Sequence, residues 1–195
     1  MSNVRIVTDS ACDLPAEVAD KMGIEIVPLS IRFGEDEFID REQLNVTEFW
    51  NRCVNMATLP ETAAPAPGQF ESVYRRLAAE GTTGIVVVSL SGQLSATIQS
   101  AELAARSLTD DDNLKLDIRI VDSRSVSMGI GTIAIACARA AADGQPLDAV
   151  EALAYELSDQ TRVFAALDTL DNLKKGGRIG GAKAFLATAL SIKPI

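Results

Sequence analysis

The segment with the most suggestive chemistry is Ser89-Leu90-Ser91-Gly92-Gln93-Leu94-Ser95-Ala96-Thr97. It leaves an apolar strand that we expect over residues 84–90 and enters a helix that we expect over residues 95–108. Free backbone N–H groups at a helix start, together with serine hydroxyls, can hold an anion without a cation. A plain serine N-cap explains the same pattern, so both interpretations stay open. A nucleophilic serine is not indicated, because neither a G-x-S-x-G elbow nor a histidine base accompanies it.

Two Asp-Ser pairs follow expected strands, in Thr8-Asp9-Ser10 and Val121-Asp122-Ser123. Ligands of open α/β sheets collect outside the carboxyl ends of the strands, which is where both pairs would lie. Ordinary Asx-turn and N-cap chemistry is the interpretation that we favour. A magnesium site built from Asp9, Asp13 and Asp122 has no support in their spacing.

The segment Gly129-Ile130-Gly131-Thr132-Ile133-Ala134 matches the relaxed dinucleotide fingerprint G-x-G-x-x-A. In that fingerprint the first glycine directly follows a strand, whereas here the strand should end near Asp122, about six residues too early. We therefore favour close packing of a helix on the sheet over nucleotide binding.

A glycine-rich connection carries the cations Lys174, Lys175 and Arg178. Residues 177–183 are not a P-loop, because Ala182 separates the last glycine from Lys183. In an acidic chain the three cations form a positive patch that can pair with an anion. A flexible connection with solvated charges explains them equally well.

The composition excludes several classes of function. The chain has 195 residues, no histidine, three cysteines and a formal charge of −9. Histidine-dependent catalysis and histidine-ligated metal sites are absent from this sequence, and the cysteines form no CxxC pair. The negative charge disfavours nucleic acid and anionic lipid surfaces as partners. We see no signal peptide or stable membrane insertion, and we expect a cytoplasmic protein.

The order of expected elements predicts the fold class. Helices and apolar strands alternate from residue 69 onward, which is typical of an α/β protein whose mainly parallel sheet carries helices on both faces. We also expect one long strand over residues 24–33, an irregular proline-stiffened loop over residues 59–68 and a strand over residues 162–167.

Five short segments in the same order resemble the DegV family of bacterial fatty-acid-binding proteins. They are Thr8-Asp9-Ser10 with Asp13-Leu14-Pro15, Thr62-Ala63-Ala64-Pro65 with Pro67-Gly68 and Phe70, Leu94-Ser95-Ala96-Thr97 with Gln99-Ser100-Ala101, Val121-Asp122-Ser123 with Met128-Gly129, and Leu173-Lys174-Lys175-Gly176-Gly177-Arg178-Ile179.

The resemblance implies a lipid carrier without catalytic residues, metal or cofactor. Such a carrier holds a long-chain fatty acid such as palmitate between two α/β domains and presents its carboxylate to a dihydroxyacetone-kinase-like fatty acid kinase, which phosphorylates it. The family's carboxylate-binding hydroxyls fall on Thr62 and Ser95, and its arginine in the glycine-rich connection falls on Arg178.

The resemblance also implies a domain division. Residues 1–157 would form a first domain of the dihydroxyacetone-kinase-like (EDD) fold, and residues 158–195 would begin a second α/β domain that is truncated at its C-terminal end. Family members usually have Ser-Gln in place of Ala63-Ala64, which would alter the pocket.

Two other functions stay open from the sequence. A nucleotide-binding α/β enzyme would use the segment from Gly129 to Ala134, and a regulatory interaction domain would bind neither lipid nor nucleotide.

Overall fold

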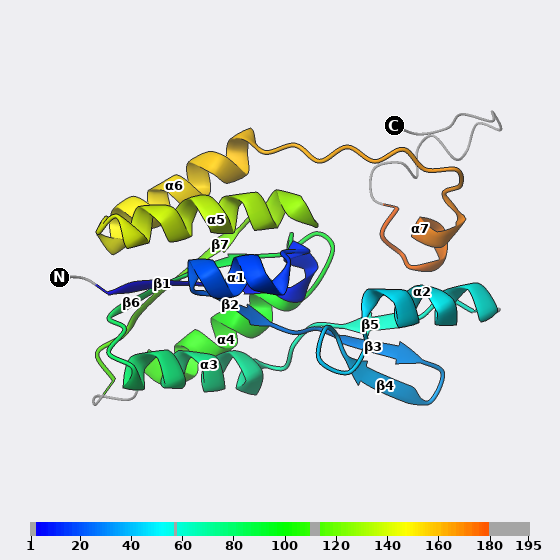
Figure 1. The fold of residues 1–195 in the computed structure, drawn as a ribbon, viewed down its shortest axis with the longest axis horizontal. Coiled ribbons are helices and arrows are strands. Elements are labelled where there is room, and N and C mark those ends of the chain that lie inside the picture. Colours follow the sequence, from blue (N-terminus) through cyan, green and yellow to red (C-terminus); the bar gives the residue numbers. More distant parts are fainter. Residues whose placement is uncertain (1–2, 57, 110–113, 180–195) are drawn as a thin grey trace.

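A computed structural model of the chain describes residues 3–56, 58–109 and 114–179, and its architecture is α/β (Figure 1). The main sheet has four parallel strands in the order β2-β1-β6-β7. They are β1 (Val4–Asp9), β2 (Ile24–Val27), β6 (Gly84–Ser89) and β7 (Asp117–Asp122). The mainly parallel sheet predicted from the alternation of elements is therefore confirmed.

Helices cover both faces of this sheet, as predicted (Figure 1). One face carries α1 (Ala16–Met22), α5 (Met128–Ala142) and α6 (Leu147–Gln160), and the other carries α3 (Pro67–Ala79) and α4 (Thr97–Thr109). Side chains alternate between the two faces, so Ile6 of β1 packs with the first group of helices and Val7 with the second. Burial on both sides explains the nearly continuous apolar runs of these strands.

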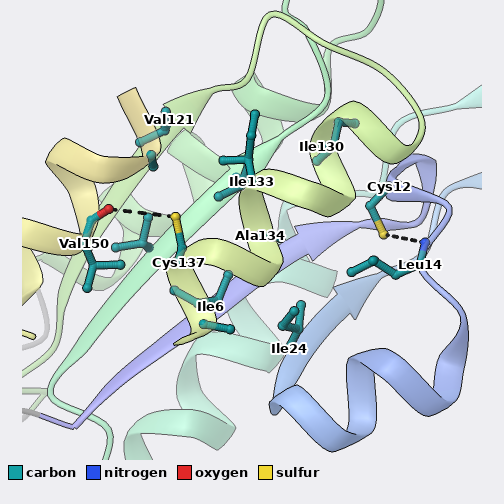
Figure 2. Packing of buried hydrophobic residues seen from close by; sticks show 14 of the residues in the cluster. Ile6, Cys12, Leu14, Ile24, Val121, Ile130, Ile133, Ala134, Cys137 and Val150 are labelled. Atoms are coloured by element: carbon teal, nitrogen blue, oxygen red, sulfur yellow. Dashed lines mark hydrogen bonds between the residues drawn. The ribbon is translucent and has the colours of Figure 1, made fainter. Parts of the chain in front are cut away.

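The core beneath α5 is built from aliphatic side chains and two cysteines (Figure 2). Cys137 is fully buried, and its Sγ lies 3.9 Å from the carbonyl oxygen of Val150 on α6. Burial raises the pKa of the Cys137 thiol to about 12. Cys12 is equally buried, and its Sγ accepts a hydrogen bond from Leu14 N at 3.5 Å. Both thiols therefore serve packing.

A second, smaller sheet lies beside the main one (Figure 1). It is antiparallel, with the order β4-β3-β5, and its strands are β3 (Ser30–Phe33), β4 (Asp36–Ile39) and β5 (Glu61–Ala63). Helix α2 (Val46–Asn55) covers it through Phe49 and Cys53.

Three of the expected elements are corrected. The long strand over residues 24–33 is two strands of different sheets, separated by Pro28, which has no N–H for a ladder. The loop over residues 59–68 contains β5 and the first residues of α3, because the proline-free triplet pairs with β3 and Pro67 suits a first helical turn. Residues 162–167 form no strand, since the described part of the chain offers them no pairing partner.

The chain's last described helix is α7 (Asp171–Lys175), which precedes the glycine-rich connection. Among the described residues, no helix is both long enough and apolar enough to cross a membrane.

Candidate functional site

Asp9 ends β1 and is almost completely buried. Its Oδ2 accepts a hydrogen bond from Leu90 N at 2.8 Å, and its Oδ1 accepts one from Ala11 N at 3.1 Å. Burial raises the pKa of Asp9 to about 6, although these two backbone hydrogen bonds act in the opposite direction. The carboxylate therefore caps the 3₁₀-helix at Ser10–Cys12 and also fastens the loop that follows β6.

Asp122 ends β7 and holds the same loop from the other side. Each of its carboxylate oxygens lies 3.3 Å from Gly92 N, and Oδ1 also accepts a hydrogen bond from Arg124 N at 2.8 Å. The favoured Asx-turn and N-cap interpretation of the two Asp-Ser pairs is confirmed. In the described residues, no group of three or more His, Cys, Asp or Glu side chains could hold a metal ion.

The loop between β6 and α4 is a tight turn built around Ser91. Its carbonyl oxygen accepts hydrogen bonds from Leu94 N at 2.9 Å and from Ser95 N at 3.2 Å. Its own N–H donates to the carbonyl oxygen of Ser125 at 3.1 Å, which ties the turn to the connection after β7. These bonds determine where Ser95 lies.

Ser95 is half-buried and precedes the first turn of α4. Its Oγ accepts a hydrogen bond from Thr97 N at 3.3 Å and lies 2.9 Å from Thr97 Oγ1. Ser95 therefore forms a serine turn one residue before the N-cap position of α4, which Ala96 occupies, so the plain N-cap interpretation of Ser95 is wrong in detail. The same hydroxyl lies at the positive end of a 13-residue helix, an environment that favours an anion.

Arg178 reaches this loop from the far end of the chain. Its Nε donates a hydrogen bond to the carbonyl oxygen of Leu94 at 3.2 Å, and its Nη1 donates one to that of Gly176 at 2.7 Å. Gly177 has φ +75°, a backbone conformation that glycine adopts at little cost, and this turn directs Arg178 back toward the loop. The structure thus brings Arg178 to the residue that precedes Ser95.

Thr62 lies elsewhere, at the centre of β5 in the small sheet. It pairs with Ile31 in antiparallel register, so both side chains project from the same face of that sheet. Ile31 lines a largely apolar pocket of about 680 Å³, to which Leu14, Phe49 and Trp50 also contribute. Within the described residues, no hydrogen bond joins Thr62 to Ser95 or Arg178.

Gly131, the second glycine of the G-x-G-x-x-A segment, has a packing role. Six residues separate the end of β7 at Asp122 from Gly129, the first glycine of the segment, which is the gap that the sequence predicted. A Cβ on Gly131 would lie 2.7 Å from the carbonyl oxygen of Cys12 and 2.9 Å from Leu14 Cδ2. The glycine lets the helix approach the chain after β1, as the packing interpretation requires. The later part of the glycine-rich connection, from Gly180 to Lys183, lies outside the described residues, as do residues 191–195.

A second pocket, next to the loop that carries Ser95, was not predicted from the sequence. It measures about 410 Å³, and its lining includes Leu94, Arg124, Ser125 and Arg162. Arg162 comes from a segment that we predicted as a strand, and no spacing in the sequence links it to the other three residues. The Val121-Asp122-Ser123 motif was the only signal that pointed toward this region.

Known proteins resemble the chain over nearly its whole length. The family model of DegV, described as an uncharacterised protein family, matches residues 3–195. A DegV domain-containing protein of Clostridium perfringens is 35% identical over 193 residues, which are 99% of this chain and 67% of that relative.

Solved structures agree. A DegV family protein from Thermus thermophilus, described by its fatty acid binding, is 36% identical, with a TM-score of 0.85 over 98% of this chain and 66% of that one. A stearic acid-binding protein from Eubacterium ventriosum is 29% identical, with a TM-score of 0.77 over 97% of this chain and 62% of that one. The chain thus spans about two thirds of the length of these relatives. It belongs to the DegV family.

Proposed function

We propose that this chain binds a long-chain fatty acid and presents its carboxylate to a dihydroxyacetone-kinase-like fatty acid kinase. The observation that carries the proposal is the hydrogen bond from Arg178 Nε to the carbonyl oxygen of Leu94. It brings a cation beside Ser95 and the N-terminus of α4, so three groups that favour an anion meet at one edge of the sheet.

The charge of Arg178 is available to a ligand. Among the described residues it forms no ion pair, and its hydrogen bonds go to two carbonyl oxygens. The side chain is exposed, and Ser95 is half-buried, so a carboxylate held between them stays accessible to a second protein. In a chain with a formal charge of −9, such a local cation distinguishes this place from the surrounding surface.

A site for a fatty acid must meet two requirements, one for the apolar tail and one for the carboxylate. The tail is stabilised by about 0.8 kcal/mol for each buried CH₂ group, whereas the carboxylate must not be left buried without hydrogen bonds. Hydroxyl groups and helix amides satisfy the carboxylate without neutralising it in a tight ion pair. That arrangement suits a transfer in which a carboxylate oxygen attacks the γ-phosphorus of ATP on the kinase and ADP leaves.

The relatives support the lipid class. The Thermus thermophilus protein is described as binding fatty acid, and the Eubacterium ventriosum protein as binding stearic acid. We extend both descriptions to this chain, with Thr62 as a further hydroxyl for the carboxylate and with the cytoplasm as the compartment where the kinase finds its ATP.

The first test is extraction. The chain is purified from cells and extracted with organic solvent, and the extract is analysed by mass spectrometry beside a mock extract of an unrelated protein of similar charge. We expect about one equivalent of a long-chain fatty acid for each chain. An extract without fatty acid, from folded protein that also fails to bind added palmitate, contradicts the proposal.

The second test is the transfer itself. The loaded chain is mixed with the kinase and ATP, and the acyl phosphate is trapped with hydroxylamine as the hydroxamate. We expect a hydroxamate only when the chain, the kinase and ATP are all present. If the kinase forms as much hydroxamate from free palmitate without the chain, the chain binds fatty acid but does not present it to the kinase.

A further inference from the structure

A pocket of about 410 Å³ lies where the connection between β7 and α5 meets the end of α6. Its polar and charged lining comes from two segments of the chain, the connection around Arg124 and Ser125 and the segment from Ser158 to Arg162. Leu94 lines it too, so the pocket adjoins the loop that carries Ser95.

Ser125 has an unused hydroxyl in this pocket. The residue is only 7% exposed, and its backbone N–H and carbonyl are hydrogen-bonded to Ser123 and Ser91. Within the described part of the chain, its Oγ has no hydrogen-bond partner. Because this hydroxyl lines the pocket, it can donate a hydrogen bond to a ligand bound there.

Gly129 makes room for that hydroxyl. A Cβ on Gly129 would lie 2.0 Å from Ser125 Oγ and 2.6 Å from Cγ2 of Val163, which also lines the pocket. The hydroxyl therefore lies between the first turn of α5 and the wall of the pocket, at a position that only a glycine permits.

Two guanidinium groups line the pocket against one carboxylate. Arg124 Nη2 pairs with Asp159, and Arg162 Nη1 donates to the carbonyl oxygens of Asp159, at 2.6 Å, and Thr161, at 2.8 Å. A guanidinium has five N–H donors, so these contacts leave several of them available on each arginine. The pocket thus combines a surplus of positive charge with a surplus of donors.

The N-terminus of α5 adds to that surplus. The helix has 15 residues, and its N-cap Ser127 has φ +56° and makes no hydrogen bond from its side chain to the first turn. The positive end of the helix therefore lies next to Ser125 and Val126, which line the pocket.

We propose that this pocket binds a phosphate group, held by Ser125, Arg124 and Arg162 beside the first turn of α5. A phosphate group offers up to three terminal oxygens and about two negative charges, and it accepts the paired donors of a guanidinium. Free phosphate, a nucleotide and an acyl phosphate share this chemistry. The proposal stands on the pocket alone and is independent of the proposed fatty acid.

The test is isothermal titration calorimetry of the whole chain with three probes: inorganic phosphate, AMP and a long-chain acyl phosphonate that resists hydrolysis. The variants are Ser125→Ala, which removes only the unused hydroxyl, and Arg162→Gln. Arg139→Gln, an exposed arginine near the opposite end of α5, is the matched control. Circular dichroism and thermal melting of each variant report whether the fold is kept.

We expect at least one probe to bind, with an affinity about tenfold or more weaker in Ser125→Ala and in Arg162→Gln and unchanged in Arg139→Gln. The tightest probe identifies the source of the phosphate group. A phosphonate that binds equally to all four proteins engages only through its chain and gives no support. The proposal is overturned if none of the three probes binds, or if every probe that binds does so equally to all four folded proteins. The outcomes with phosphate and AMP do not depend on whether the purified protein carries a fatty acid.

Discussion

The carboxylate of Asp9 accepts a hydrogen bond from the backbone N–H of Leu90 at 2.8 Å, across 81 residues of sequence. This bond joins the end of β1 to the loop that follows β6, and Asp122 holds the same loop at Gly92. The loop that positions Ser95 is therefore fastened by one carboxylate on each side. Its shape depends on the main sheet and not on α4 alone.

This arrangement predicts an unusual pH dependence of stability. Burial raises the pKa of Asp9 from 3.8 to about 6 in the folded chain. Between these values the unfolded chain has released the proton that the folded chain still holds, so the free energy of unfolding falls as pH rises through this window. The shift corresponds to about 3 kcal/mol.

The measurement is urea unfolding of the wild type and of Asp9→Asn between pH 4 and pH 7. The stability of the wild type relative to the variant should decline by about 2.4 kcal/mol over this range and level off near pH 7. Asp20→Asn, at an exposed position of α1, serves as control and should run parallel to the wild type. A constant difference between wild type and Asp9→Asn contradicts the prediction.

The second prediction concerns Gly131. In Gly131→Ala the new Cβ would meet the carbonyl oxygen of Cys12 and Leu14, so we expect the free energy of unfolding to fall by about 1–3 kcal/mol. Gly68→Ala is the matched control, because its Cβ would enter open space on α3, and alanine there is neutral or stabilising by up to about 1 kcal/mol. The measurement is the free energy of unfolding of both variants, obtained by denaturant titration. Equal stability of the two would remove the packing role of Gly131.

The third prediction separates the two roles of Ser95. Through its hydrogen bond with Thr97 N, its hydroxyl contributes about 1 kcal/mol to the stability of the turn before α4, which Ser95→Ala should lose. As a donor to a fatty acid carboxylate, it contributes about 1.5–3 kcal/mol to binding, so palmitate affinity should fall about tenfold or more. Ser72→Ala, at an exposed serine of α3, should leave palmitate binding unchanged.

Thr62→Val tests the other hydroxyl without a change of shape. Thr62 is exposed on β5, and valine suits a strand, so the fold should be kept. We expect a loss of palmitate affinity similar to that of Ser95→Ala, measured by the same titration. If Thr62→Val binds like the wild type while Ser95→Ala does not, the carboxylate contacts α4 and not the small sheet.

The fifth prediction concerns Arg178. Its side chain is exposed, so Arg178→Gln should leave the melting temperature unchanged while palmitate affinity falls about tenfold. Arg178→Lys keeps the charge but cannot reproduce the guanidinium contact with the Leu94 carbonyl, so we expect only partial recovery. Arg106→Gln, on the exposed side of α4, is the control. Full binding by Arg178→Gln would contradict a role in holding the carboxylate.

Local pattern was sufficient to predict most of the main sheet and its covering helices. Strands such as β6 are apolar on both faces and bounded by turn residues, and the apolar run of α5, with 15 residues, is too long for a strand. The errors arose where the formation of a strand depends on pairing with a strand that is distant in the sequence. Glu61–Ala63 becomes a strand only because β3 lies beside it, and residues 162–167 have no such neighbour among the described residues.

In the candidate site, too, the features set by local sequence could be predicted and those set by distant contacts could not. Ser95 could be singled out from local chemistry because hydroxyls, a glycine and a helix start occur together. The contact of Arg178 with Leu94 spans 84 residues, and no local pattern encodes it. The pocket that contains Ser125 and Arg162 has the same origin, since its walls meet only after α5 and α6 have packed.

The small sheet has a consequence for how the chain tolerates change. β2 ends at Val27 and α3 begins at Pro67, so the small sheet and α2 form one excursion from the main layer. Strands β3 and β4 are close in sequence and pair as a hairpin, whereas the paired residues of β1 and β6 are separated by about 80 residues. The entropy of closing such a connection grows only slowly, by about 0.6 kcal/mol for each doubling of its length. The excursion can therefore gain or lose residues over evolution while the parallel sheet and its edge are preserved.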